Sequence, residues 1–132
     1  WIQVESYLEK DSSRGAWEFA DWGLPTAYLL AALRDFPGRI IASGGIRTGS
    51  ELAKALALGA ELGGAALPFI RAFAEGGVRA ILERIALMEK TLRAVMLLTG
   101  SKNIEALKKA PLWSDPLFDL TVKSLKKADE SS

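Results

Sequence analysis

The chain has 132 residues, 49% of them hydrophobic, and a formal net charge of +1, and it contains neither cysteine nor histidine. This length fits one domain with a sizeable core, but not a complete (β/α)₈ barrel of about 250 residues. The near-neutral charge argues against nucleic-acid binding. The missing residue types exclude disulfides, thiol nucleophiles, Ser–His hydrolysis and Cys- or His-ligated metals. No run approaches the about 18 apolar residues of a membrane span and no signal peptide is visible, so we expect a cytoplasmic protein without a membrane partner.

The first third of the chain predicts one clear helix. Residues 1–10 have a mixed apolar pattern that indicates a short helix, and the polar, glycine-bearing stretch 11–23 indicates a loop. Pro25 suits the first turn of a helix, because the N–H it lacks is not needed there. We therefore predict a helix over 26–36 that ends at Pro37 and Gly38.

A strand-to-helix unit follows. The short apolar run 39–43 is typical of a buried strand in a parallel sheet. Gly44 and Gly45 come next. Thr48, with Glu51 three residues later, forms the pattern of a capping box and predicts a helix over 50–60.

The same order repeats after Gly59, which we expect to be the first residue past that helix. Residues 61–67 are apolar and small and predict a second buried strand. A short helix over 68–75 should stop at Gly76-Gly77. A longer helix over 78–98 is indicated by apolar residues at helical spacing.

The final third predicts one more helix and a tail. Gly100 should end the long helix, and Ser101 should cap a helix over 102–110 that closes at Pro111. Residues 116–132 are interpreted as a polar C-terminal tail.

Strand, helix, strand and helix in this order indicate a βαβ unit with parallel pairing. Only two convincing strands are present, and a two-stranded parallel sheet leaves faces and edges without cover. The fold class is therefore α/β, as a helix-rich part of a larger fold.

The most informative site candidate is the turn after the first predicted strand. Gly44 and Gly45 allow backbone N–H groups to approach a bound group closely, and the N-terminus of the next helix favours an anion. Arg47 adds a possible charge-assisted contact. On these residues alone, an ordinary strand-to-helix turn remains an equal alternative.

A second run of small residues, 63–68, follows the other strand. In (β/α)₈ enzymes, the loops after strands seven and eight, with a short extra helix, frequently build a phosphate site. The residues fit that scheme if 40–43 is strand seven, 63–66 is strand eight and 68–75 is the extra helix.

Three motifs then resemble a known family. Residues 42–49 (ASGGIRTG), 21–27 (DWGLPTA) and 98–107 (LTGSKNIEAL) are similar to the C-terminal portion of type 2, FMN-dependent isopentenyl-diphosphate isomerase. FMN α-hydroxyacid oxidases and inosine-monophosphate dehydrogenases fit less well, since they usually carry aspartate where Ser43 stands. The oxidases also usually have a Gly-Arg-Pro-like run where this chain has 66–68 (ALP).

The resemblance implies that residues 1–115 form the C-terminal segment of an FMN-binding TIM barrel, containing strands seven and eight. It implies FMN-binding residues at the ends of these two strands and in the turns that follow them: Gly44, Gly45, Ile46, Arg47, Ala66 and Leu67. It implies no catalytic residue and no metal ligand in this chain, because the family's reacting groups would lie upstream of Trp1.

The resemblance also implies the reaction of the parent protein. That family interconverts isopentenyl and dimethylallyl diphosphate in isoprenoid biosynthesis, with reduced FMN, Mg²⁺ and NADPH, and its members are commonly tetramers or octamers. We expect this chain alone to be inactive, since those reacting groups are not in it. Its start at Trp1 rather than methionine fits a processed product or a fragment. A fragment of another FMN-dependent TIM-barrel oxidoreductase, a stand-alone phosphate-binding module and a self-associating remnant remain alternatives.

Overall fold

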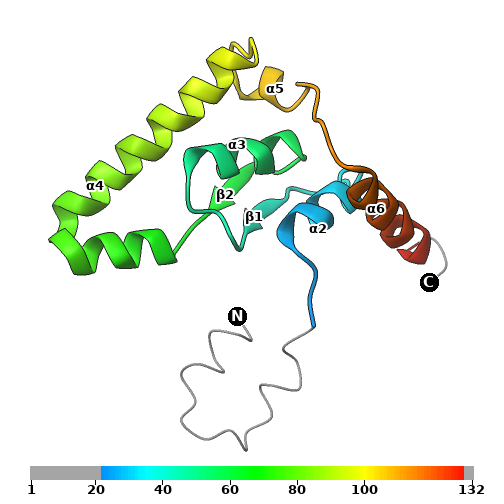
Figure 1. Ribbon diagram of the computed structural model, residues 1–132, viewed down its shortest axis with the longest axis horizontal. Coiled ribbons are helices and arrows are strands. Elements are labelled where there is room, and N and C mark those ends of the chain that lie inside the picture. Colours follow the sequence, from blue (N-terminus) through cyan, green and yellow to red (C-terminus); the bar gives the residue numbers. More distant parts are fainter. Residues whose placement is uncertain (1–21, 130–132) are drawn as a thin grey trace, which may run out of the picture.

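The structure is a computed structural model that describes residues 22–129. The helix expected over residues 1–10 lies outside the described residues. The described part contains a small parallel sheet with helices around it (Figure 1).

A βαβ unit forms the centre of the molecule, as predicted. Strand β1 (Ile41–Ser43) pairs in parallel with β2 (Leu62–Gly64), and α3 (Gly49–Ala57) connects them. The register pairs Ile41 with Leu62, Ala42 with Gly63 and Ser43 with Gly64. Both strands are shorter than the sequence predicted. Leu67, expected at the end of the second strand, is instead the first residue of a helix.

Helix α2 (Thr26–Ala32) begins after Pro25, as expected, but it ends earlier than residue 36. Proline disfavours helical conformation at the residue before it and has no N–H to donate. The last turn before Pro37 therefore tightens, and the N–H of Phe36 donates to the carbonyl of Leu33 at 2.9 Å.

Helix α3 has the two ends that the sequence predicted. Thr48 and Glu51 form a capping box at its start. At its end Gly59 adopts φ +116°, and its N–H and that of Ala60 donate to the carbonyls of Leu56 and Ala55. This pair of bonds is a Schellman motif, which satisfies carbonyls that the helix leaves without partners.

Helix α4 (Leu67–Leu98) is continuous in its bounds but has non-helical geometry at Gly76 and Gly77, with φ +62° and ψ −151° at Gly77. This kink confirms the predicted division into a short and a long helix. None of the helices within residues 22–129 is long and apolar enough to cross a bilayer.

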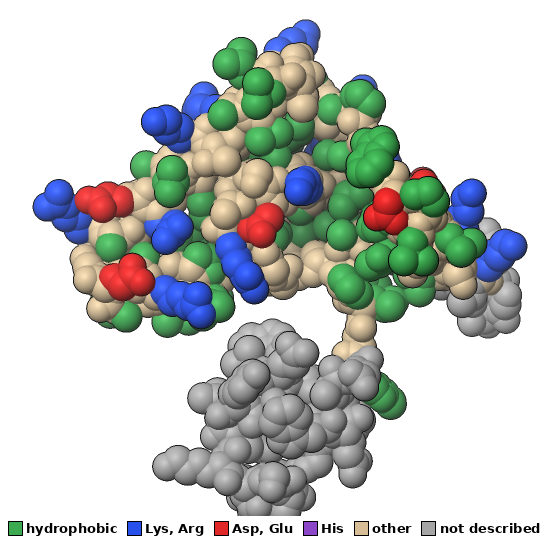
Figure 2. Space-filling model, in the orientation of Figure 1, with side chains coloured by type: hydrophobic (Ala, Val, Ile, Leu, Met, Phe, Trp, Pro, Cys, Tyr) green, Lys and Arg blue, Asp and Glu red, His purple; other side chains and the backbone are tan. Residues whose placement is uncertain are grey.

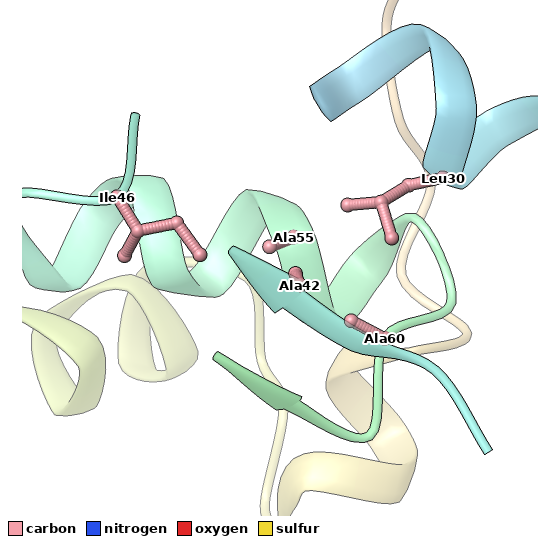
Figure 3. Close-up of a cluster of buried hydrophobic side chains, with 5 residues drawn as sticks. All are labelled: Leu30, Ala42, Ile46, Ala55 and Ala60. Atoms are coloured by element: carbon pink, nitrogen blue, oxygen red, sulfur yellow. The ribbon is translucent and has the colours of Figure 1, made fainter. Parts of the chain in front are cut away.

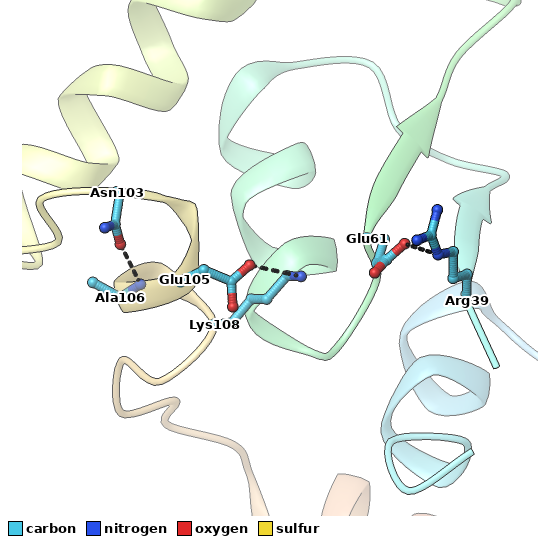
Figure 4. Close-up of polar contacts among 6 residues, drawn as sticks. All are labelled: Arg39, Glu61, Asn103, Glu105, Ala106 and Lys108. Carbon is cyan, nitrogen blue, oxygen red and sulfur yellow. Dashed lines mark hydrogen bonds and ion pairs between the residues drawn. The ribbon is translucent and has the colours of Figure 1, made fainter. Parts of the chain in front are cut away.

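Helix α5 (Ile104–Leu107) begins two residues later than predicted. Its cap is Asn103, whose Oδ1 accepts the N–H of Ala106 at 2.8 Å (Figure 4), so the prediction of Ser101 as the cap was wrong. Ser101 is buried, and its N–H donates to the carbonyl of Met96 at 2.7 Å, which closes the end of α4.

Residues 116–129, interpreted from the sequence as part of a polar tail, form helix α6 (Pro116–Asp129). It packs against α2, where the rings of Tyr28 and Phe118 stack with their centroids 4.8 Å apart. Lys126 Nζ lies 2.7 Å from Asp35 Oδ2 and holds the pKa of that carboxyl below its ordinary value.

The core lies between α3 and the sheet and is built from small side chains. Ala42, Ala55 and Ala60 pack with Leu30 and Ile46 (Figure 3). A second cluster joins α3, α4 and α5 around Leu107. Small residues let the helix approach the strands closely, which fixes the loops at the strand ends.

The opposite face of the sheet has no cover in the described residues. Ile41 is 65% exposed and Leu62 61%, whereas Ala42, which points to the α3 side, is 2% exposed. Other large apolar side chains are also exposed, and hydrophobic side chains gather on the visible surface around α2 and α6 (Figure 2).

Candidate functional site

The predicted site residues lie at one edge of the sheet. Gly44 and Gly45 directly follow β1, and Ala66 follows β2 by two residues. Because the strands are parallel and Ser43 pairs with Gly64, both loops leave the sheet at the same edge. The structure thus brings together the two runs that sequence analysis paired as one possible phosphate site.

The first loop has a backbone that only glycine adopts readily. Gly44 has φ +96° and Gly45 has φ +78°, and every positive φ in the described residues belongs to glycine. A Cβ added at Gly44 would lie 3.0 Å from Thr26 Oγ1, whereas one added at Gly45 would meet open space. The two glycines are therefore required for different reasons, contact and conformation at Gly44 and conformation alone at Gly45.

Thr26, which sequence analysis included in the 21–27 motif but gave no role, holds this loop from α2. Its Oγ1 lies 3.1 Å from the carbonyl oxygen of Ser43 and 2.9 Å from that of Gly44. In the sequence Thr26 is an ordinary residue after Pro25 at a helix start. No local pattern indicates that its hydroxyl reaches a loop 18 residues away.

Glu51 holds the other end of the loop. Its Oε2 accepts the backbone N–H of Arg47 at 2.7 Å and of Thr48 at 2.9 Å. These bonds, with that to the Arg47 N–H the strongest, lower the pKa of Glu51 below its ordinary value. The N–H of Arg47 is therefore already used, and Arg47 can contact a ligand only through its exposed guanidinium group.

The two helix N-termini at this edge differ. The first turn of α3 is satisfied by the capping box, and the carboxylate of Glu51 already lies there. Helix α4 starts at Leu67, and its N-cap residue, Ala66, provides no side-chain cap. Sequence analysis placed an anion at the first of these termini, but the free positive end of a helix dipole belongs to the second.

The remaining predicted residues contribute backbone or surface. Ile46 is 6% exposed, and its side chain belongs to the core. Ala66 and Leu67 are exposed at the start of α4.

A cavity of about 420 Å³ opens between α2, the loop after β1 and one side of α3. Its lining includes Gly44, Gly45, Ile46, Thr26 and Glu51. Arg47, Ala66 and Leu67 do not line it. This volume is within the range of small-ligand sites.

Within the part of the chain that the structure describes, no three acidic side chains lie close enough together to hold a metal ion. The groups at this edge that suit an anion are backbone N–H donors, the N-terminal dipole of α4 and the guanidinium group of Arg47.

Comparisons with known proteins agree on one family. The family model described as FMN-dependent dehydrogenase matches residues 21–114. The chain is similar to the isopentenyl-diphosphate delta-isomerase of Pyrococcus abyssi, with 44% identity over 117 residues, covering 85% of this chain and 31% of that protein. The corresponding protein of Archaeoglobus fulgidus is 47% identical over 107 residues, 80% of this chain and 30% of its own length. That of Thermococcus onnurineus is 38% identical over 135 residues, 92% of this chain and 36% of its own length. The chain thus spans about a third of these relatives.

Proposed function

Because this chain belongs to the family of FMN-dependent dehydrogenases, we propose that it supplies the site that binds the phosphate of FMN. The observation that carries this proposal is the loop at Gly44 and Gly45. Its two consecutive positive φ angles lie beside the uncapped N-terminus of α4, at the carboxyl edge of a parallel sheet. This edge is where open and closed parallel sheets bind phosphorylated ligands.

The residues present fit a phosphate group. The main-chain N–H groups of Gly44, Gly45 and Ile46 are short-range donors, and the dipole of α4 adds partial positive charge. Arg47 supplies a guanidinium group that pairs with phosphate oxygens. Ala66 and Leu67 present the backbone at the start of α4. Bound FMN would supply the redox and proton-transfer chemistry of the parent protein.

The bare face of the sheet supports the proposal that this chain is the C-terminal part of a (β/α)₈ barrel. In such barrels helices cover the outer face of each strand, and large aliphatic side chains fill the interior. Here α3 covers one face, while Ile41 and Leu62 are exposed side by side on the other. β1 and β2 would be strands seven and eight.

We further propose that the whole protein interconverts isopentenyl and dimethylallyl diphosphate, as the names of its relatives indicate. The groups that bind the diphosphate, Mg²⁺ and NADPH would belong to the rest of that protein. This chain would contribute the residues that bind the phosphate of FMN, and on its own it would not turn over substrate.

The test is an isomerisation assay on the protein that contains this chain. With reduced FMN and Mg²⁺, isopentenyl diphosphate should be converted to dimethylallyl diphosphate with no net consumption of reductant. A protein that leaves isopentenyl diphosphate unchanged but oxidises a 2-hydroxy acid would contradict the substrate proposal and favour an oxidase.

A further inference from the structure

The loop at Gly44 is held by one side chain from another element. Thr26 Oγ1 lies within hydrogen-bonding distance of two successive carbonyl oxygens, those of Ser43 at 3.1 Å and Gly44 at 2.9 Å. One hydroxyl at the start of α2 therefore engages two neighbouring peptide units of the loop.

These contacts also set the direction of two backbone N–H groups, those of Gly44 and Gly45. The described residues contain no cis peptide bond, and in a trans peptide the C=O and N–H groups point in opposite directions. The carbonyl of Ser43 shares its peptide unit with the N–H of Gly44, and the carbonyl of Gly44 shares its own with the N–H of Gly45. Holding both carbonyls toward Thr26 therefore directs both N–H groups away from α2.

The other end of the loop sets a limit on these donors. Glu51 accepts the N–H groups of Arg47 and Thr48, so these two donors are not available to a ligand. The N–H groups of Gly44 and Gly45 are oriented by Thr26, whereas those of residues 47–48 donate to Glu51 in the first turn of α3. Successive N–H groups that face one side form an anion-binding concavity.

We propose that Thr26 is a positioning residue for phosphate binding: its hydroxyl orients the Gly44 and Gly45 N–H groups toward the phosphate of the flavin. This inference rests on the proposed function. Thr26 itself does not touch the phosphate, because its hydroxyl faces the carbonyl side of the same peptide units.

The experiment compares FMN with riboflavin, which has the same ring system but no phosphate. Dissociation constants for both are measured by flavin fluorescence on the whole protein that contains this chain, as wild type, Thr26→Val and Thr26→Ser. Valine keeps the shape of threonine without the hydroxyl, and serine keeps the hydroxyl.

Thr26→Val should weaken FMN binding by about tenfold, the effect of losing about one hydrogen bond, and leave riboflavin binding within about twofold. Thr26→Ser should restore FMN binding. A merely structural role would weaken both flavins together, and that result would overturn the inference, as would a Thr26→Val protein that retains the full preference for FMN. A wild type without any preference for FMN over riboflavin would instead contradict the proposed function itself.

Discussion

The two faces of the small sheet are built from different residues. Toward α3 the sheet presents Ala42, and a Cβ added at Gly63 would run into Leu52, so this face admits only small groups. Away from α3 it presents Ile41 and Leu62, which are large, aliphatic and more than half exposed. One face is therefore covered by α3, while the other carries large apolar residues, typical of a core, that nothing in the described residues covers.

This difference shows which part of the architecture the chain can complete alone. Fully burying a leucine or isoleucine side chain stabilises a fold by about 1.5–3 kcal/mol, and parallel sheets are normally covered on both faces. The α3 face gains that stabilisation within the chain. In the barrel that we propose, the Ile41–Leu62 face would gain it when other strands close over it.

The largest expected effect tests whether the bare face is buried in the whole protein. Leu62→Asp should lower its free energy of unfolding by about 3 kcal/mol or more, because an aspartate would replace an apolar contact inside the barrel. Leu120→Asp is the matched control, since Leu120 is 65% exposed against 61% for Leu62 and lies on α6. Equal, small losses in chemical denaturation of both variants would contradict a closed barrel.

A smaller loss is expected on the covered face. Ala42→Leu adds three carbon atoms where Ala42 is 2% exposed, and overpacking of this kind costs about 1–3 kcal/mol. Ala94→Leu adds the same atoms at an exposed position of α4 and should change stability little. If both variants unfold at the wild-type urea concentration, α3 does not pack closely on the sheet.

The cap of the covering helix should contribute about 1 kcal/mol. Thr48→Ala removes the oxygen that accepts the N–H of Glu51 at 3.3 Å, and losses of this size are typical of N-cap threonines. Thr48→Ser keeps that oxygen and should recover most of the stability in thermal unfolding. A serine variant as unstable as the alanine variant would argue against the capping role.

The smallest effect is a pH dependence from Glu51. Its pKa in the folded chain lies below the ordinary value of 4.5, so its stabilising bonds are present above that value and are lost as the pH falls through the folded pKa. Thermal unfolding between about pH 6 and pH 3 should show a steeper loss for wild type than for Glu51→Gln. Parallel curves would show that the carboxylate does not stabilise the loop.

Features with local signals were predictable from the sequence. The Thr48–Glu51 capping box, the glycines that end α3 and α4, and the glycine kink in α4 each depend on residues a few positions apart. The same holds for the positive φ angles at Gly44 and Gly45. These signals placed the candidate loop at a strand end before its geometry was known.

Features that depend on distant contacts were not predictable in the same way. The reach of Thr26 to the Gly44 loop joins residues 18 positions apart, so it follows from how α2 packs against that loop and not from spacing. Helix α6 did have a signal, since Pro116 follows Asp115, whose Oδ1 accepts the N–H of Phe118 at 2.9 Å. The many charged residues of this segment led instead to its interpretation as a polar tail.

The central claim, that this loop binds the phosphate of FMN, is tested most directly by the ratio of riboflavin to FMN dissociation constants. The comparison uses the wild-type protein, Gly45→Ala and Gly100→Ala. Gly45 and Gly100 both have positive φ, +78° and +66°, with open space around an added Cβ, so both substitutions strain the backbone alike. We predict at least about a tenfold preference for FMN in wild type and Gly100→Ala, and its loss in Gly45→Ala. Equal affinities for the two flavins in wild type, or an unchanged preference in Gly45→Ala, would contradict the account.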